Sequence, residues 1–403
     1  MKRKAIIFVL MAATLVIPVF AKDTAMEPFD MPTAASNGFG GHHVAYTDNV
    51  FSLLVNPASM INVQQASFFT LAPSLFSPQS VFEMRKGVID LIKGDSSAIG
   101  KTAETLSNKN GKIALGMDIR ELPLSFAWVA NGFGLGFWYR TYVNANIIGL
   151  TVEANVFADA MLPIGFAFRI FNFERHSLDA GITIKPFARV MASEMDNITS
   201  LVDNTGDFID NINLPLIVGG TFDAGLIYRW TGGLRVGFTF NDIYSRGTVV
   251  HNFNSKVKDE STYYIPFTMN LGIAYELKLG FLGLALAADW HDIRNVFLQD
   301  NYLRRNYLLD LSAGFQLSLF NMIKFRVGMN EMLPSCGLGF DFGPCEIDLA
   351  YYGKEFGNEP GQLSAAVMEV SIAIRPDVKK KNVPWTRRSI VGLFTGKDYI
   401  PAE

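Results

Sequence analysis

The feature that most constrains this sequence is an alternation of apolar with small or polar side chains, repeated at a period of two along most of the chain after residue 66. In residues 215–230, for example, Val218 and Phe222 fall on one face while Thr221 and Asp223 fall on the other. A period of two is that of a β-strand, and strands of this length are uncommon in soluble sheets. Charged residues make up only 18% of the chain and aromatic residues 13%, which suits strands that face lipid on one side and a lumen on the other.

The pattern divides into fourteen strands, joined alternately by short turns and long connections. Outer-membrane barrels have short turns on the periplasmic side and long loops outside. We therefore predict an all-β fold, a 14-stranded antiparallel transmembrane β-barrel whose even strand number brings both termini to the periplasmic side. The predicted strands are 66–74, 122–130, 133–143, 163–171, 177–190, 215–230, 234–244, 264–277, 281–291, 307–319, 323–330, 336–342, 345–353 and 364–375.

Some of the long connections carry periodic patterns of their own. Residues 147–157 alternate like a strand, but a separate strand there would make the total odd. We therefore assign them to an outer loop or to an upward extension of the third strand. Residues 80–106, within the connection 75–121, and residues 191–212 place apolar side chains at helical spacing, which predicts helical outer loops. Such helices need something to bury their apolar faces, either each other or a lipid-like ligand.

The two ends of the chain differ from the strand region. Residues 1–21 have a basic start, an apolar stretch and small residues at the end, which is typical of a cleaved signal peptide. After them we find no apolar run long enough for a membrane helix. The last segment contains three prolines and a basic cluster, which we interpret as an extended periplasmic arm. The expected organisation is a signal peptide at 1–21, a periplasmic or lumenal hatch at 22–62, a transmembrane barrel at 63–375 and a periplasmic basic tail at 376–403.

Residues 35–60, directly before the strands, are compact irregular backbone. They contain a glycine cluster, two adjacent histidines and the sequence Asn56-Pro57-Ala58. Glycine and Asn-Pro pairs break regular structure. Pro57 keeps Asn56 out of the helical region, and the Asn56 side chain can cap exposed backbone groups. We predict a plug that fills the lumen; the alternative for the Asn-Pro-Ala sequence is an ordinary surface turn.

This arrangement resembles the FadL-like family of long-chain fatty-acid transporters, through the glycine-rich segment and the Asn-Pro-Ala motif within residues 35–60. The resemblance implies a 14-stranded barrel plugged by an N-terminal hatch, helical outer loops that dock fatty acids, and a hatch that shifts to open a path, sideways near Gly134 and Gly136. A secretion-shuttle branch of related barrels shares the motif. The chain departs from the family pattern in carrying a tail after the last strand. The hatch-motif residues are Gly40, Gly41, His42, Asn49, Asn56, Pro57 and Ala58.

The predicted lumen face carries many charges, which must be paired or hydrated if buried. They either hold the plug in place or, for one or two arginines, receive a carboxylate head group. The predicted ligand contacts are Trp138, Arg140, Phe82, Leu91 and Phe208. The predicted lumen charges are Arg140, Arg169, Asp179, Lys185, Asp223, Arg229, Arg235, Asp289, Asp310, Lys324, Arg326, Glu346, Asp348 and Glu369.

Other chemistries find little support in the sequence. The net charge of −3 offers no basic surface for nucleic acid. The five histidines are scattered, so packing within the hatch is expected of His42 and His43 rather than a metal site. No catalytic or nucleotide-binding motif is present. Cys336 and Cys345 lie in one predicted hairpin about 20 Å apart along the sheet, beyond disulfide reach, so both should be free thiols facing lipid.

We therefore predict a monomeric channel without enzymatic activity or cofactor, in the outer membrane of a diderm bacterium. Its expected partners are a long-chain fatty acid or another hydrophobic small molecule and the outer-membrane lipid. Two alternatives remain at this point, a binding or secretion-shuttle barrel that carries a protein partner and a plain polar porin.

Overall fold

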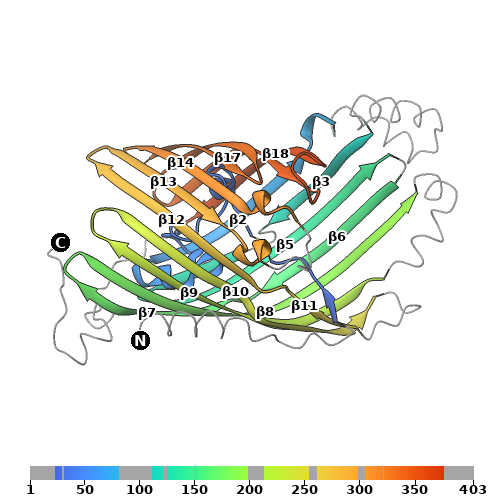
Figure 1. Cartoon of the computed structure of the whole chain (residues 1–403), viewed down its shortest axis with the longest axis horizontal. Helices are drawn as coiled ribbons and strands as arrows, with labels where there is room; N and C mark the ends of the chain where they lie inside the picture. Colours follow the sequence, from blue (N-terminus) through green and yellow to red (C-terminus); the bar gives the residue numbers. More distant parts are fainter. Residues whose placement is uncertain are drawn as a thin grey trace.

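The computed structural model describes residues 23–29, 31–80, 111–120, 125–149, 151–197, 213–253, 261–297, 305–320 and 322–375. In this part of the chain, one closed sheet surrounds a few short helical segments (Figure 1). The elements in chain order are β1 (Asp23–Ala25), α2 (Ala34–Gly38), α3 (Ser52–Val55), η1 (Pro57–Asn62), β2 (Gln64–Phe76), β3 (Lys112–Arg120), β4 (Ser125–Ala130), β5 (Phe133–Ile148), β6 (Thr151–Met161), β7 (Ile164–Phe173), β8 (His176–Asn197), β9 (Pro215–Trp230), β10 (Leu234–Asn252), β11 (Thr262–Tyr264), β12 (Thr268–Leu279), β13 (Leu282–Trp290), η2 (Ile293–Val296), η3 (Tyr307–Asp310), β14 (Leu311–Leu319), β15 (Ile323–Asn330), β16 (Leu333–Asp341), β17 (Cys345–Glu355) and β18 (Ser364–Ile374).

These segments form a closed antiparallel barrel of fourteen strands. Three strands are each made of two segments: β3 with β4, β6 with β7, and β11 with β12. Counting each composite strand once and leaving β1 aside gives the fourteen positions, and the pairing of β18 with β2 closes the ring. Each predicted strand has its counterpart, and the predicted architecture is confirmed. No helix of the described residues is long and apolar enough to cross a membrane.

Two composite strands correct the predicted boundaries. Residues 112–120 form β3, the outer part of the second strand, and do not belong to an outer connection. Residues 147 and 148 end β5 as predicted, but residues 151–157 belong to β6, which is the outer half of the fourth strand and not a loop. Pro163, which lacks an N–H, interrupts this strand without a change of register. The total therefore stays even.

Only part of each predicted outer helix can be compared with the structure. Residues 191–197 continue β8 as a strand and pair with β6, so the helix predicted from residue 191 is wrong at its start. The long extension of β8 is held by cross-strand pairing along its full length, and this pairing overrides the local helical spacing. Residues 198–212 and almost all of 80–106 lie outside the described residues, as do the signal peptide and the tail.

The two faces of the sheet follow the predicted alternation. Outward side chains such as Val218, Leu226 and Ile273 are exposed, whereas inward ones such as Thr221 and Asp223 are buried. Cys336 lies opposite Tyr351, as the predicted hairpin register requires, and both cysteines are free. An outward belt of apolar side chains is the surface that a bilayer requires of a barrel.

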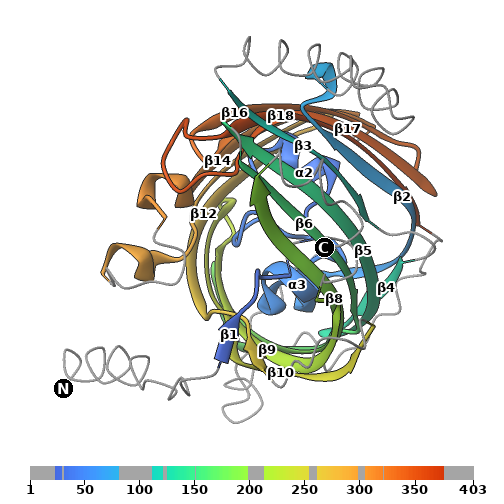
Figure 2. The same ribbon diagram turned by 90° about the vertical axis from the view of Figure 1, so that its right-hand side faces the viewer.

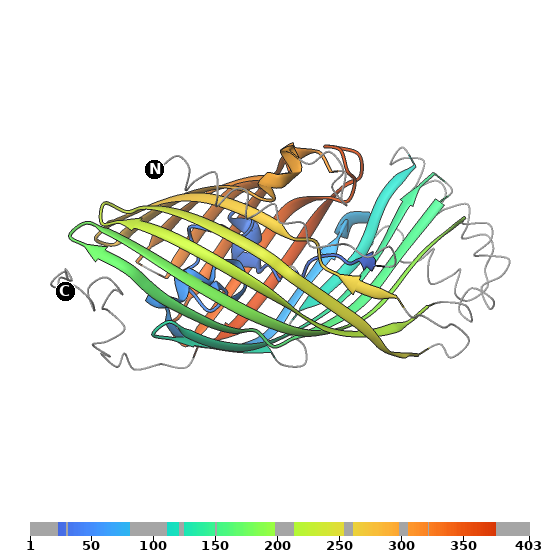
Figure 3. The ribbon, with the colours of Figure 1, turned by 60° about the horizontal axis from the view of Figure 1, so that its bottom comes forward.

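Residues 26–29 and 31–62 lie inside the barrel and, together with β1, are called the hatch below; Figure 2 looks into the barrel and shows α2 and α3 within the ring of strands. The wall is uneven in height, because β8 and β10 are far longer than β14 and β15 (Figure 3). The hatch begins at β1, which pairs in parallel with β11 in the taller half of the wall. The first described residue, Asp23, is therefore in the outer half of the barrel and not at the predicted periplasmic end.

Candidate functional site

The Asn-Pro-Ala motif fixes the turn between the hatch and the first strand. Asn56 has an extended backbone and caps η1, because its Oδ1 accepts from the Ala58 N–H at 3.1 Å. Its Nδ2 donates to the Val44 carbonyl at 2.9 Å and to the Leu226 carbonyl of β9 at 3.2 Å. The side chain is fully buried. The capping role predicted from sequence is confirmed, and the same amide also attaches the hatch to the wall.

Eight lumen-facing glycines, which we call the glycine belt, allow the hatch to approach the wall. A methyl group at Gly337 would lie 2.9 Å from the Cα of Gly38, and one at Gly237 would lie 2.7 Å from the Val44 carbonyl oxygen. Where the nearest atoms belong to the hatch backbone, there is no room for a side chain and the residue must be glycine. At Gly134 and Gly165 the nearest atoms are the ends of the Leu53 and Met60 side chains. The belt consists of Gly134 on β5, Gly165 on β7, Gly181 on β8, Gly225 on β9, Gly237 on β10, Gly314 on β14, Gly328 on β15 and Gly337 on β16.

An apolar cluster holds the end of the hatch against the wall. Leu53 and Met60 are fully buried. Their side chains occupy the space that a Cβ atom at Gly134 or Gly165 would enter. The Phe51 ring lies 6.0 Å from the Trp138 ring, which is also fully buried. Burial of a large aromatic side chain contributes on the order of 2–3 kcal/mol. Trp138 therefore packs against the end of the hatch, and its position does not support the predicted ligand contact.

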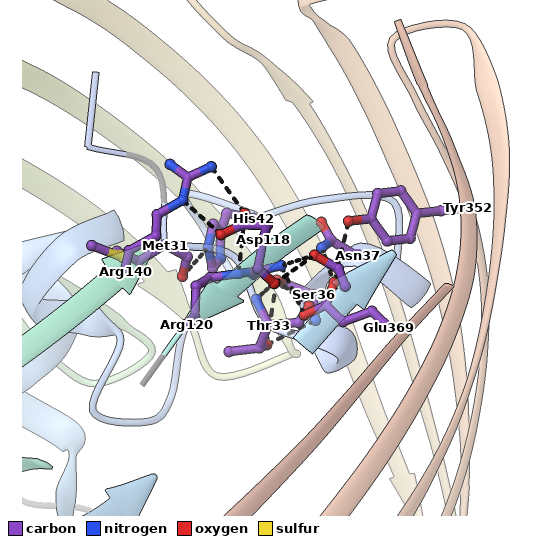
Figure 4. Close-up of polar contacts among 11 residues, drawn as sticks. Met31, Thr33, Ser36, Asn37, His42, Asp118, Arg120, Arg140, Tyr352 and Glu369 are labelled. Atoms are coloured by element: carbon purple, nitrogen blue, oxygen red, sulfur yellow. Dashed lines mark hydrogen bonds and ion pairs between the residues drawn. The ribbon is translucent and has the colours of Figure 1, made fainter. Parts of the chain in front are cut away.

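A polar cluster joins α2 to β18 (Figure 4). Thr33 and Ser36 form a reciprocal capping box at the start of α2. Asn37 donates to Glu369 Oε2 at 2.6 Å, and the Tyr352 hydroxyl donates to the same oxygen at 3.2 Å. His42, farther along the hatch, contacts the Met31 carbonyl at 3.2 Å. The packing expected of His42 within the hatch is thus present, and no metal-binding group of side chains occurs in the described residues.

The charges of the lumen wall are paired across neighbouring strands. Arg140 binds Asp118 through two contacts of 2.9 Å, and Lys185 lies 2.8 Å from Asp223. Pairing of this kind is what buried charges require. Further pairs join Arg120 with Glu369, Arg169 and Arg229 with Asp179, Arg189 with Asp159, Arg235 with Asp48 and Glu276, Lys324 with Glu346, and Arg326 with Asp348.

One lumen cation differs from these pairs. Lys354 of β17 is half-buried and has no carboxylate within ion-pair distance among the described residues. Its ammonium lies 5.8 Å from the ring centres of Phe76 and Tyr142 and 5.5 Å from that of Phe356. Aromatic faces attract a cation by about 0.5–2 kcal/mol. They do not neutralise it, so among the described residues Lys354 is a cation without a carboxylate partner.

Lys354 belongs to a layer of rings that covers α2 from the outer side, which we call the aromatic layer. Phe76, Tyr142 and Phe157 pack on Ala34 of α2 in one buried cluster. The Tyr142 and Phe157 rings are stacked at 4.4 Å. Arg140 lies over both of these rings, 5.0 Å from one and 5.1 Å from the other. The layer therefore combines apolar surface with positive charge directly above the hatch.

The opposite side of the hatch opens into a different environment. A cavity of about 360 Å³ lies between the hatch and the lower parts of β12, β14, β15, β17 and β18. Its lining includes Gln316, Ser318, Lys324, Glu346 and Asp348. Charged and amide groups of this density favour water over an apolar molecule. The lumen thus combines aromatic rings with paired charges above the hatch, whereas charged and amide groups dominate below it.

The pairing of β5 with the second strand changes register beside the hatch. β5 pairs with β4 as far as Phe137 and with β3 from Arg140 onward. Gly134 and Gly136, predicted to mark a sideways opening, lie on the other side of β5 in continuous pairing with the fourth strand. The change of register comes directly after them, where the Tyr139 N–H donates to Ser125 Oγ at 3.1 Å.

The remaining predicted ligand contacts are separated by the structure. Arg140 lines the lumen as predicted, but its charge is already matched by Asp118. Phe82, Leu91 and Phe208 lie outside the described residues. Asp310, predicted to line the lumen, lies in η3, where its carboxylate accepts from Asn295 at 2.6 Å. Of the hatch-motif residues, Gly40 lies against β14 and β15, and Asn56 lies against β9.

Comparison with known proteins decides the fold family. No family model and no curated protein matches the sequence. Among solved structures, a mutant of TodX, described as a monoaromatic hydrocarbon channel, matches 87% of this chain and 100% of its own with 12% identity and a TM-score of 0.51. The chain has the fold of the FadL-family channels. The toluene transporter TbuX of Ralstonia pickettii is 12% identical, with 85% and 97% of the two chains covered and a TM-score of 0.46. A FadL homologue of Pseudomonas aeruginosa is 11% identical, with 86% and 98% covered and a TM-score of 0.43.

Within this FadL-type fold, the sequence did not reveal several lumen residues. Asp118 and Arg120 lie on β3, whose inward Ala114 and Gly116 hide the alternation. Lys354 could have been found, because it continues the inward series of Asp348 and Tyr352 along β17. That it has no carboxylate partner among the described residues could not have been found in this way, because ion pairs form between strands that are distant in sequence.

Proposed function

We propose that this protein is an outer-membrane channel for the entry of amphipathic hydrophobic molecules, long-chain fatty acids among them. The observation that carries the proposal is the contrast across the hatch. The aromatic layer with Lys354 lies on the outer side, and the polar cavity lies on the other. An apolar chain gains about 25 cal/mol for each Å² of surface that it buries among rings, and gains nothing among hydrated charges.

Lys354 supports an acidic head group on the cargo. Its ammonium is the lumen cation without a carboxylate among the described residues, whereas the arginine predicted for this role is paired with Asp118. A carboxylate that reaches Lys354 forms a charge-assisted hydrogen bond without displacing a native partner. The hydrocarbon chain would pack on Phe76, Tyr142 and Phe356, which surround the ammonium.

The path past the hatch is proposed to run sideways. Transfer of an acyl chain into the cavity lined by Lys324, Glu346 and Asp348 is unfavourable, because those charges would lose hydration. The change of register between β5 and the second strand, next to Trp138, is the place we propose for an exit toward the surrounding lipid. The hatch residues Phe51 and Leu53 pack in the same cluster as Trp138, so movement of the hatch would loosen this region.

The test is binding of laurate and of dodecanol, a neutral molecule of equal chain length, to purified protein in detergent. We expect Lys354→Met to weaken laurate binding at least about tenfold, since a hydrogen bond to a charged group contributes about 1.5–3 kcal/mol, and to leave dodecanol binding unchanged. Lys278→Met serves as the control, because Lys278 lies on β12 with its side chain 76% exposed.

Three outcomes separate the alternatives. If Lys354→Met weakens the binding of laurate and of dodecanol equally, Lys354 contributes packing and not charge to the site. No binding of either ligand to the wild-type protein, with a stable protein partner in its place, would favour a secretion-shuttle barrel. Free ionic conductance through the intact protein would favour a polar porin.

A further inference from the structure

His43 joins the hatch to β13, and both of its ring nitrogens face hydrogen-bond acceptors. Nδ1 contacts Asp289 Oδ2, and Nε2 lies 2.9 Å from the Phe39 carbonyl oxygen. The two side chains of the pair are 1% and 0% exposed. A neutral imidazole has one N–H and one lone pair, so it can satisfy only one of two acceptors, whereas an imidazolium donates to both. The two contacts therefore fit a protonated His43 beside an ionised Asp289 in the closed hatch.

The same carboxylate holds the neighbouring backbone. Asp289 Oδ1 accepts from the Val44 N–H at 2.8 Å, and the Val44 carbonyl accepts from Asn56. Residues 43 and 44 are thus clamped between β13 on one side and, through Asn56, β9 on the other. Among the described residues, His43 is the ion-pair partner of Asp289. The negative charge of this clamp is therefore balanced by the imidazolium.

The other charged groups around the pair have ion-pair partners of their own. Arg235 is paired with both Asp48 and Glu276, and Arg326 lies 2.6 Å from Asp348. Burial raises the pKa of the Tyr46 phenol, so Tyr46 stays neutral. An imidazole is the side chain whose charge changes near neutral pH. The groups on the elements packed around His43 are Tyr46 and Asp48 of the hatch, Arg235 of β10, Glu276 of β12, Asp289 of β13, Arg326 of β15 and Asp348 of β17.

We propose that His43 is a protonated latch whose charge keeps the hatch on β13. At low pH the imidazolium makes both hydrogen bonds and balances Asp289. As pH rises and His43 loses its proton, one acceptor loses its donor and Asp289 becomes an uncompensated buried carboxylate, which is strongly unfavourable. The closed position is therefore stabilised on the acid side and weakened on the alkaline side. This inference uses the proposed function only in taking the hatch to close the lumen.

The protonation state can be measured without any transport assay. In ¹⁵N-histidine-labelled protein, the ring nitrogens of an imidazolium resonate apart from those of a neutral ring. With five histidines in the chain, the His43→Gln variant assigns the signal. We expect two protonated ring nitrogens at about pH 7, because both nitrogens face acceptors in the closed hatch. A neutral His43 ring at that pH overturns the proposal.

The latch is tested by ionic current through single proteins in a planar bilayer between about pH 5 and about pH 9, the range in which an imidazole titrates. The wild-type current should rise by a factor of at least about five from the acidic to the alkaline end of this range, because the latch weakens as His43 loses its proton. Asp289→Asn and His43→Gln should conduct at the high level throughout, with heat-modifiable gel mobility showing a folded barrel. The control is His42→Gln, whose histidine contacts the Met31 carbonyl and which should keep the wild-type response.

Two results of the current measurement count against the latch. A wild-type current that does not change with pH, combined with a protonated His43, removes the proposed role in opening. A pH response that survives in His43→Gln assigns the titration to another group. The proposed channel function is judged separately by laurate binding, so its failure is distinguishable from failure of the latch.

Discussion

Single residues on the wall determine how closely the hatch can sit. A side chain at Gly225 would overlap the amide of Asn56. This amide donates hydrogen bonds to the carbonyl of Val44, within the hatch, and to the carbonyl of Leu226 on β9. The neighbouring Gly220 on the same strand faces open space, with no atom within 4 Å of an added Cβ. The two glycines therefore form a matched pair, one in contact with the hatch and one away from it.

Gly225→Ala should displace the hatch without unfolding the barrel. We expect the variant to conduct ions at all pH values and to keep its heat-modifiable gel mobility, since the strand ladder does not involve the Asn56 side chain. Gly220→Ala should behave like the wild type. A closed Gly225→Ala channel would show that the hatch can shift to accommodate a methyl group here.

Asp310 provides a pH-dependent contact outside the membrane strands. Burial raises the pKa of its carboxyl to about 6, and the contact with Asn295 opposes that rise only in part. Because the folded pKa lies above the unfolded value of about 3.9, the folded form binds more protons between these values. The stability of the η2–η3 region should therefore increase as pH falls from about 6 to about 4. The protection factors of the backbone amides 293–297 against hydrogen exchange, which are corrected for the intrinsic pH dependence of exchange, should rise in this window, and Asp310→Asn should abolish the rise.

The strands obey the alternation rule so closely that opposite substitutions on one strand can be predicted. Phe315 points outward from the middle of β14 and is 38% exposed, whereas Ser318 points inward and lines the polar cavity. Phe315→Arg should cost about 2–4 kcal/mol of unfolding free energy, because the charge would enter hydrocarbon, and Ser318→Arg should cost far less. Urea titration of protein refolded into vesicles measures both. Equal losses would mean that the faces are assigned wrongly.

Most of the barrel could be predicted from sequence because each strand carries its own face pattern. The register of the Cys336 hairpin followed from one short turn at Gly343 and Pro344. β3 and β6 were missed as strands for different physical reasons. In β3 the inward Ala114 and Gly116 are not polar, and in β6 the break at Pro163 separated the outer half from β7.

The candidate site could be predicted only where its contacts are local. The cap that Asn56 provides to Ala58 spans two residues and was readable from the motif. The pairing of His43 with Asp289 spans 246 positions and was not. The same holds for Lys354. That it has no carboxylate partner among the described residues depends on side chains of neighbouring strands, which are distant in sequence.

For the whole molecule, the hatch is expected to separate a closed channel from an open pore. Deletion of residues 24–60 removes all hatch contacts but no strand-to-strand pair apart from that of β1. We expect a folded barrel with large ionic conductance, while the intact protein is nearly closed to small ions. An intact protein that conducts as freely as the deletion would show that the hatch plugs nothing.

The position of β1 sets a limit on how any opening can occur. The hatch is attached to the wall at both of its ends, through β1 on β11 in the outer half and through β2 at the periplasmic end. A segment anchored at two heights cannot swing out of the barrel as a hinged unit while both attachments persist. It can only bend between them, so in the proposed function cargo would pass beside a plug that remains in the lumen. The width of the passage is then governed by the slack in residues 26–62 and not by the diameter of the barrel.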